Sequence, residues 1–183
     1  LNHRNPPNFI GFITNYEKSK RFVEYEKLKD LINVDKKNVS FVSVLVNPND
    51  EILENIKDLN FDYYQLYDVD PKRTEEIKSK YKIKIITAIT VSIKDDVVKY
   101  KEYSDISDVI LFDSKGYHKS ESFDHNLLNE VPNGLNKMIA GNIQIENIPN
   151  FKNKNFMIDL SGALEDENGK KDIKKIDKLL NTV

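Results

Sequence analysis

Short apolar runs alternate with helix-like segments along the whole of this 183-residue chain. The runs are rich in Val, Ile and Phe and are apolar on both faces, which is typical of strands buried in a parallel sheet. They occupy residues 8–13, 38–47, 61–66, 82–91, 108–113, 135–140 and 155–160. Segments with helical patterns follow them, at residues 23–33, 49–59, 70–81, 95–103, 122–131, 144–151 and 170–183.

Seven strand–helix units in this order predict an α/β fold with a parallel sheet. Two architectures fit, an open doubly wound sheet and a (β/α)₈ barrel of the TIM type. No G-x-G-x-x-G follows any strand, which disfavours a dinucleotide-binding sheet. Seven units are one short of a barrel, so the first strand and helix are expected to be missing. With no linker or break in composition, residues 1–183 are expected to form one barrel domain, incomplete at its N-terminus.

Composition excludes several classes of function. The net charge is −2, so there is no bulk attraction to nucleic acid or to acidic membranes. The chain has no cysteine, which excludes disulfides, thiolate metal sites and a cysteine nucleophile or base within it. His118 and His125 form no metal-binding pattern with nearby acids, so no metal is expected. No apolar run reaches the roughly 18 residues that a membrane span needs, and a cytoplasmic protein is expected.

Two charged residues follow strands of the predicted sheet. Function in both architectures lies at the C-terminal ends of the strands, where Asp113 follows the fifth run and Arg21 the first. Asp113 is a candidate catalyst, although an aspartate here also caps turns. Arg21 is a candidate ligand for a carboxylate or phosphate, because the guanidinium group binds such anions in a bidentate manner. It could instead pair with Glu17 or Glu24 on the surface.

Small-residue turns follow the last two predicted strands. Gly141 and Asn142 come after the sixth, and Ser161, Gly162 and Ala163 come after the seventh. Small residues let backbone N–H groups approach an anion closely, and the N-terminus of a following helix adds a favourable dipole. In barrels these two loops are a frequent phosphate site. Ordinary tight turns between a strand and a helix would also need glycine here.

Seven motifs together resemble phosphoribosylanthranilate isomerase, an enzyme of tryptophan biosynthesis. They run in the family's order and spacing over nearly the whole chain. They are "GFITNYEKSKRFV", "VLVN", "YYQLYD", "ILFDSK", "SFDH", "IAGNI" and "DLSGALEDENGKKDIKKI".

The resemblance implies a (β/α)₈ barrel that converts N-(5′-phosphoribosyl)anthranilate into 1-(2-carboxyphenylamino)-1-deoxyribulose 5-phosphate. This Amadori rearrangement proceeds by general acid–base catalysis and without a cofactor. The resemblance implies that Asp113 is the general acid, which protonates the ribose ring oxygen, and that Arg21 binds the anthranilate carboxylate. The phosphate is then expected at Gly141–Asn142 and at 161–163. The expected partner is a small phosphorylated substrate, with the protein a monomer or homodimer.

The chain departs from the family pattern at several positions. The family's general base is a cysteine on its first strand, which this chain lacks, so the chain as given is expected to be inactive or poorly active. Tyr67 replaces a family histidine, and "GYHKSES" at 116–122 replaces a glycine-rich turn. Two other functions therefore stay open: a non-catalytic phosphate-binding barrel, and another sugar-phosphate barrel enzyme of amino-acid biosynthesis.

Overall fold

A computed structural model describes residues 1–114, 122–151 and 154–182. These residues contain seven strands, which form one parallel sheet in the order of the chain. The strands are β1 (Phe9–Ile13), β2 (Ser40–Val46), β3 (Tyr63–Tyr67), β4 (Lys84–Val91), β5 (Val109–Ser114), β6 (Lys137–Ile139) and β7 (Met157–Ile158). An α/β barrel-type fold is confirmed, and the doubly wound alternative is wrong because its strand order would reverse within the sheet.

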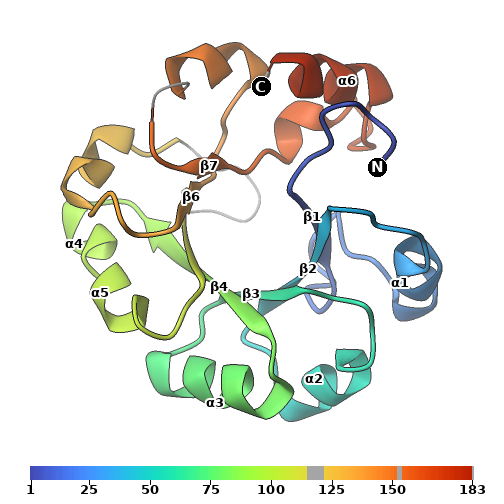
Figure 1. The fold of residues 1–183 in the computed structure, drawn as a ribbon, viewed down its shortest axis with the longest axis horizontal. Helices are drawn as coiled ribbons and strands as arrows, with labels where there is room; N and C mark the ends of the chain where they lie inside the picture. Colours follow the sequence, from blue (N-terminus) through green and yellow to red (C-terminus); the bar gives the residue numbers. More distant parts are fainter. Residues whose placement is uncertain (115–121, 152–153, 183) are drawn as a thin grey trace.

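Helices surround this curved sheet on its outer side (Figure 1). The α-helices are α1 (Tyr25–Ile32), α2 (Asp50–Ile56), α3 (Pro71–Tyr81), α4 (Lys94–Val97), α5 (Tyr100–Tyr103) and α6 (Ile173–Thr182). Three 3₁₀ helices complete the ring: η1 (His125–Glu130), η2 (Ile145–Phe151) and η3 (Gly162–Leu164). None of the helices in these described ranges has the length and apolar character needed to cross a membrane.

The sheet is open between β1 and β7, because each of these strands pairs on one side only within the described residues. The segment before β1 crosses to α6 (Figure 1). There Arg4 donates to the side chain of Asn181 at 3.0 Å, and His3 Nε2 lies 3.4 Å from Asp177 Oδ1. The two ends of the described chain therefore meet on the outside of the sheet.

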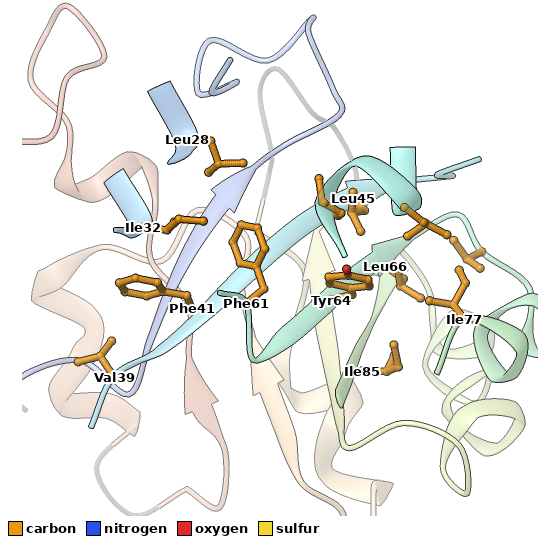
Figure 2. Packing of buried hydrophobic residues seen from close by; sticks show 13 residues of the cluster. Leu28, Ile32, Val39, Phe41, Leu45, Phe61, Tyr64, Leu66, Ile77 and Ile85 are labelled. Atoms are coloured by element: carbon orange, nitrogen blue, oxygen red, sulfur yellow. The ribbon is translucent and has the colours of Figure 1, made fainter. Parts of the chain in front are cut away.

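Apolar side chains pack between the outer face of β1–β4 and the helices α1–α3. Figure 2 shows this layer, in which α1 residues Leu28 and Ile32 lie toward the sheet beside Phe41 and Phe61. Strands β2 and β3 contribute Phe41, Leu45, Tyr64 and Leu66, each at most 2% exposed. Burial of this apolar surface is the main force that holds the helices against the sheet.

Leu28→Ala is expected to lower the free energy of unfolding by about 2–5 kcal/mol, because it leaves a cavity in this layer. Leu28 is 1% exposed, whereas Leu31 of the same helix is 42% exposed. Leu31→Ala is the matched control and should change stability by less than about 1 kcal/mol. Urea unfolding measures both variants. Equal losses would contradict the placement of α1.

The inner face of the sheet carries alternate residues of each strand, since side chains alternate between faces. Its apolar cluster includes Tyr63 and Tyr67 of β3, Ala88 of β4 and Leu111 of β5. Continuing the alternation from Leu111 places Asp113 on the same inner face. The C-terminal ends of the strands thus direct polar side chains into the mouth of the sheet.

The predicted strands are confirmed, but the later units are less regular than expected. The predicted helix at 95–103 is split into α4 and α5, and those at 122–131 and 144–151 are 3₁₀ helices. Pro149 lies inside η2, where it cannot donate the backbone hydrogen bond of an α-helix. Strand β7 is short, with a hydrogen-bonded partner on one side only among the described residues.

Candidate active site

Asp113 lies near the C-terminal end of β5 and is partly buried. Its Oδ2 accepts a hydrogen bond from the Tyr67 hydroxyl at 2.8 Å, and its Oδ1 accepts one from the Ser114 backbone N–H at 2.8 Å. Burial raises the pKa of Asp113 above its ordinary value, although both hydrogen bonds oppose this. A raised pKa suits a carboxyl group that must donate a proton.

Tyr67 ends β3 and reaches Asp113 across the inner face of the sheet. Burial and the nearby carboxylates raise the pKa of its phenol well above the ordinary value, so the hydroxyl keeps its proton at neutral pH. Gln65 Nε2 donates to the same hydroxyl at 3.3 Å. The sequence singled out Tyr67 only as a departure from the family pattern and gave no sign of its contact with Asp113.

A second carboxyl group, that of Asp159, lies beside Asp113 at the end of β7. Its backbone N–H donates to the Ile139 carbonyl at 2.8 Å, which continues the ladder of β6 and β7. Burial and the charge of Asp113 raise its pKa to about 6, while Lys171 and Arg21 act in the opposite direction. Sequence reasoning did not select Asp159, although it lies near the end of a predicted apolar run, as Asp113 does.

Arg21 follows β1 and reaches the loop after β7. Its Nη2 donates to Glu165 Oε2 at 2.9 Å and its Nε donates to Oε1. Its predicted surface partners, Glu17 and Glu24, are not the ones it binds. The hydrogen bond with Glu165 raises the pKa of Arg21. Burial disfavours the charged form of Glu165 and acts to raise its pKa. The hydrogen bonds from Arg21 and Lys171 act in the opposite direction and together lower the pKa below its ordinary value.

Lys171 adds a second cation to this loop. Its Nζ donates to the Ser161 carbonyl at 2.8 Å and to Glu165 Oε1 at 2.9 Å. Lys171 and Glu165 also face each other in an isolated antiparallel bridge. Sequence reasoning missed both residues as site components, because neither lies at the end of a predicted strand.

Gly141 and Asn142 form a tight turn after β6. Gly141 has φ +97° and Asn142 has φ +53°. A Cβ atom at Gly141 would lie 2.4 Å from Ser114 Oγ, so the glycine lets this turn press against the end of β5. The side chain of Asn142 accepts from Gln144 Nε2 at 2.9 Å. The backbone N–H groups of Gly141 and Asn142 donate to no atom of the described residues.

The loop after β7 leads into η3, whose first hydrogen bonds come from the N–H groups of Leu164 and Glu165. The N–H groups of Gly162 and Ala163 precede these donors and, among the described residues, have no acceptor. A Cβ atom at Gly162 would lie 3.5 Å from Arg21 Nη2, so the loop adjoins the guanidinium group. The helices that follow the two loops are the 3₁₀ helices η2 and η3 and not α-helices, and η3 has only three residues.

The histidine and acidic side chains of the described residues form no candidate metal site. Across 1–114, 122–151 and 154–182, no three His, Asp or Glu side chains lie close enough to hold a metal ion. His125 instead packs against the rings of Phe123 at 4.9 Å and Phe151 at 5.5 Å. His118 lies outside the described residues, as do residues 116–121 of the altered segment at 116–122.

The structure brings the predicted residues to one end of the sheet and links them through contacts. Gly141 presses on Ser114 next to Asp113, and Gly162 adjoins Arg21. Asp159 interacts electrostatically with both groups, because Asp113 raises its pKa and Arg21 lowers it. Ionisable groups at the C-terminal end of a barrel-type sheet are typical of enzymes that act by proton transfer on small anionic molecules.

Within that class, the chain belongs to the N-(5′-phosphoribosyl)anthranilate isomerase family, which residues 4–182 match. A protein of that name from Rhizobium rhizogenes is 32% identical, over 95% of this chain and 83% of its own length. The activity of the chain is therefore that of this isomerase of tryptophan biosynthesis.

Solved structures of the family share the fold. The enzyme from Thermotoga maritima superposes with a TM-score of 0.83 at 24% identity, over 96% of this chain and 87% of that one. A second structure of the family holds reduced 1-(o-carboxyphenylamino)-1-deoxyribulose 5-phosphate. It superposes with a TM-score of 0.81 at 24% identity, over 96% of this chain and 86% of that one.

Proposed function

We propose that Asp113 is the general acid of the isomerisation and protonates the ribose ring oxygen of N-(5′-phosphoribosyl)anthranilate. The observation that carries this proposal is the partly buried Asp113 carboxyl group, held by Tyr67 at the mouth of the sheet. Burial raises its pKa, which increases the fraction of the protonated acid near neutral pH. A positioned acid of this kind contributes typically about 10²–10⁴-fold to a rate.

Arg21 binds the anthranilate carboxylate in this proposal. Glu165 occupies the Nε–Nη2 edge of the guanidinium group. The Nη1–Nη2 edge remains, and a guanidinium group has enough donors to bind a second carboxylate there. Glu165 would then hold the arginine in place while the substrate binds its other edge.

The substrate phosphate binds the two small-residue loops, Gly141–Asn142 and 161–163. The amides of both loops that donate to no atom of the described residues support this assignment, because backbone N–H groups are strong ligands for phosphate oxygens. Lys171 lies at the second loop and adds a positive charge. The relative bound to a reduced phosphorylated product shows that its family accepts such a ligand.

The domain organisation, cellular location and partners of the protein form part of the same proposal. Residues 1–183 act as one barrel domain of a cytoplasmic enzyme, without a cofactor and without nucleic-acid or membrane partners. The protein is a monomer or homodimer, and a Thermotoga maritima relative is described as dimeric.

The experiment that tests the proposed function is an assay of the chain with N-(5′-phosphoribosyl)anthranilate, followed by chromatography of the product. The expected result is slow formation of the opened 1-deoxyribulose phosphate, since the chain has no cysteine to serve as the family's general base. Binding of the reduced product without turnover would favour the non-catalytic phosphate-binding alternative. Faster turnover of a different sugar phosphate in competition would favour another barrel enzyme.

Arg21→Lys is expected to raise KM by about 10- to 100-fold, because lysine keeps the charge but loses the bidentate fork. The matched control is Arg73→Lys, since Arg73 lies on α3 in an exposed ion pair with Asp50. Steady-state kinetics of both variants measure the effect. An unchanged KM in Arg21→Lys would remove the carboxylate-binding role from Arg21.

A further inference from the structure

Tyr67 and Asp113 meet across one intervening strand. Tyr67 ends β3 and Asp113 lies near the end of β5. Strand β4 pairs with both of these strands and runs between them. The inner residue of β4 beside Tyr67 is Ala88, which belongs to the same cluster. A small side chain there leaves room for the phenol to pass over β4, and its hydroxyl reaches Asp113 Oδ2 at 2.8 Å.

The direction of this hydrogen bond follows from its neighbours. Gln65 Nε2 donates to the Tyr67 oxygen at 3.3 Å, and Gln65 is only 7% exposed. The phenol keeps its own proton at neutral pH, so it donates that proton to Asp113. Two hydrogen bonds thus run in the same donor-to-acceptor direction, from Gln65 to Tyr67 and from Tyr67 to Asp113.

Two donors fix the plane of the Asp113 carboxyl group. Tyr67 binds Oδ2, while the backbone N–H of Ser114 binds Oδ1. Each carboxylate oxygen has two lone pairs, so one lone pair on each oxygen is left to carry an acidic proton. Because Tyr67 donates its own proton to Asp113, the acidic proton of Asp113 cannot lie between the carboxyl group and the phenol. It must occupy one of the two remaining lone pairs.

We propose that Tyr67 is a positioning residue of the isomerase, which fixes the Asp113 carboxyl group and directs its acidic proton away from β3. The inference rests on the proposed role of Asp113 as the general acid. The ionisable groups that face Asp113 from neighbouring elements of the described chain are Tyr67 and Asp159. Arg21 and Lys171 act on Asp159 from the loops after β1 and β7.

The sign of the effect of Tyr67 follows from its role as a donor. A hydrogen bond donated to a carboxylate favours the charged form and lowers the pKa of the acid. Without the phenol hydroxyl, the pKa of Asp113 should therefore rise. A rise of about one unit is expected, within the usual strength of a hydrogen bond to a charged group.

The first test is carbon-13 NMR titration of the chain, with aspartate labelled at the side-chain carboxyl carbon. The Asp113 signal is identified by its loss in Asp113→Asn. In Tyr67→Phe its midpoint should move about one unit to higher pH. Tyr63→Phe is the matched control, because it removes a phenol hydroxyl from the other end of the same strand, and its midpoint should stay unchanged. An unchanged midpoint in Tyr67→Phe overturns the proposal.

The second test is the pH profile of turnover. An enzyme with a general acid loses activity as the pH rises through the pKa of that acid. In Tyr67→Phe the alkaline limb of the kcat profile should therefore move to higher pH by about one unit, as the titration midpoint does. At neutral pH kcat should fall about tenfold from loss of orientation, with KM nearly unchanged. A moved titration with an unchanged kcat and pH profile overturns the positioning role.

Failure of the proposed function gives a different result. If Asp113→Asn keeps full turnover, the acid assignment is wrong and Tyr67 has no role in the reaction, whatever the titration shows. If Asp113→Asn is inactive and Tyr67→Phe behaves as the wild type, the inference about Tyr67 alone is wrong.

Discussion

Asp113→Asn is expected to lower kcat by about 10²- to 10⁴-fold, the usual contribution of a positioned acid. Asparagine has nearly the same shape as aspartate, but its amide cannot supply the proton for ring opening. Its one side-chain oxygen can still accept one of the two hydrogen bonds that Asp113 receives, from Tyr67 or from the Ser114 backbone N–H, each at 2.8 Å. Binding of the reduced product should therefore change little, and loss of kcat with intact binding separates chemistry from recognition.

Steady-state kinetics and calorimetric binding of the reduced product measure the two effects of Asp113→Asn. Asp95→Asn is the matched control, because Asp95 is an exposed residue of α4. It removes the same charge far from the site and should leave kcat unchanged. If Asp113→Asn keeps more than about a tenth of the wild-type kcat, Asp113 is not the general acid. The loss of kcat would then be smaller than the contribution that general-acid catalysis typically makes.

Gly141→Ala is expected to have the largest effect on folding among the site variants. Alanine at φ +97° is strained, and its Cβ would lie 2.4 Å from Ser114 Oγ and 2.8 Å from the Ser114 backbone nitrogen. Backbone strain and overpacking each cost about 1–3 kcal/mol, so the free energy of unfolding should fall by about 2–6 kcal/mol. The turn would also move away from β5, and binding of the reduced product should weaken.

Urea unfolding and calorimetric titration test the prediction for Gly141. The control is Gly134→Ala, because a Cβ atom at Gly134 would meet nothing within 4 Å. That variant should change the free energy of unfolding by less than about 1 kcal/mol and leave binding intact. Similar losses of stability in both variants would show that the close contact with Ser114 is not what requires glycine at 141.

The sequence by itself determined the parts of this protein that depend on local pattern. Apolar runs of strand length alternating with helical spacing predicted the parallel barrel-type sheet, which the structure confirms. Positions at strand ends also predicted where Asp113 and Gly141 lie, because all parallel strands end at the same edge. Less regular segments were harder to predict: 95–103 has a weak helical pattern, and Pro149 interrupts 144–151.

Only the tertiary structure decided the partners of the candidate residues. Tyr67 and Asp113 are 46 positions apart, and Arg21 and Glu165 are 144 apart. No periodic pattern relates such pairs, since their contacts depend on how the sheet curves and on the small side chain of Ala88 between two strands. The pKa of Asp159 is likewise a property of its surroundings, because burial and the nearby Asp113 raise it to about 6. Local sequence determines which strands form and where they end, whereas charge and hydrogen bonding at their ends arise only when distant strands are brought together.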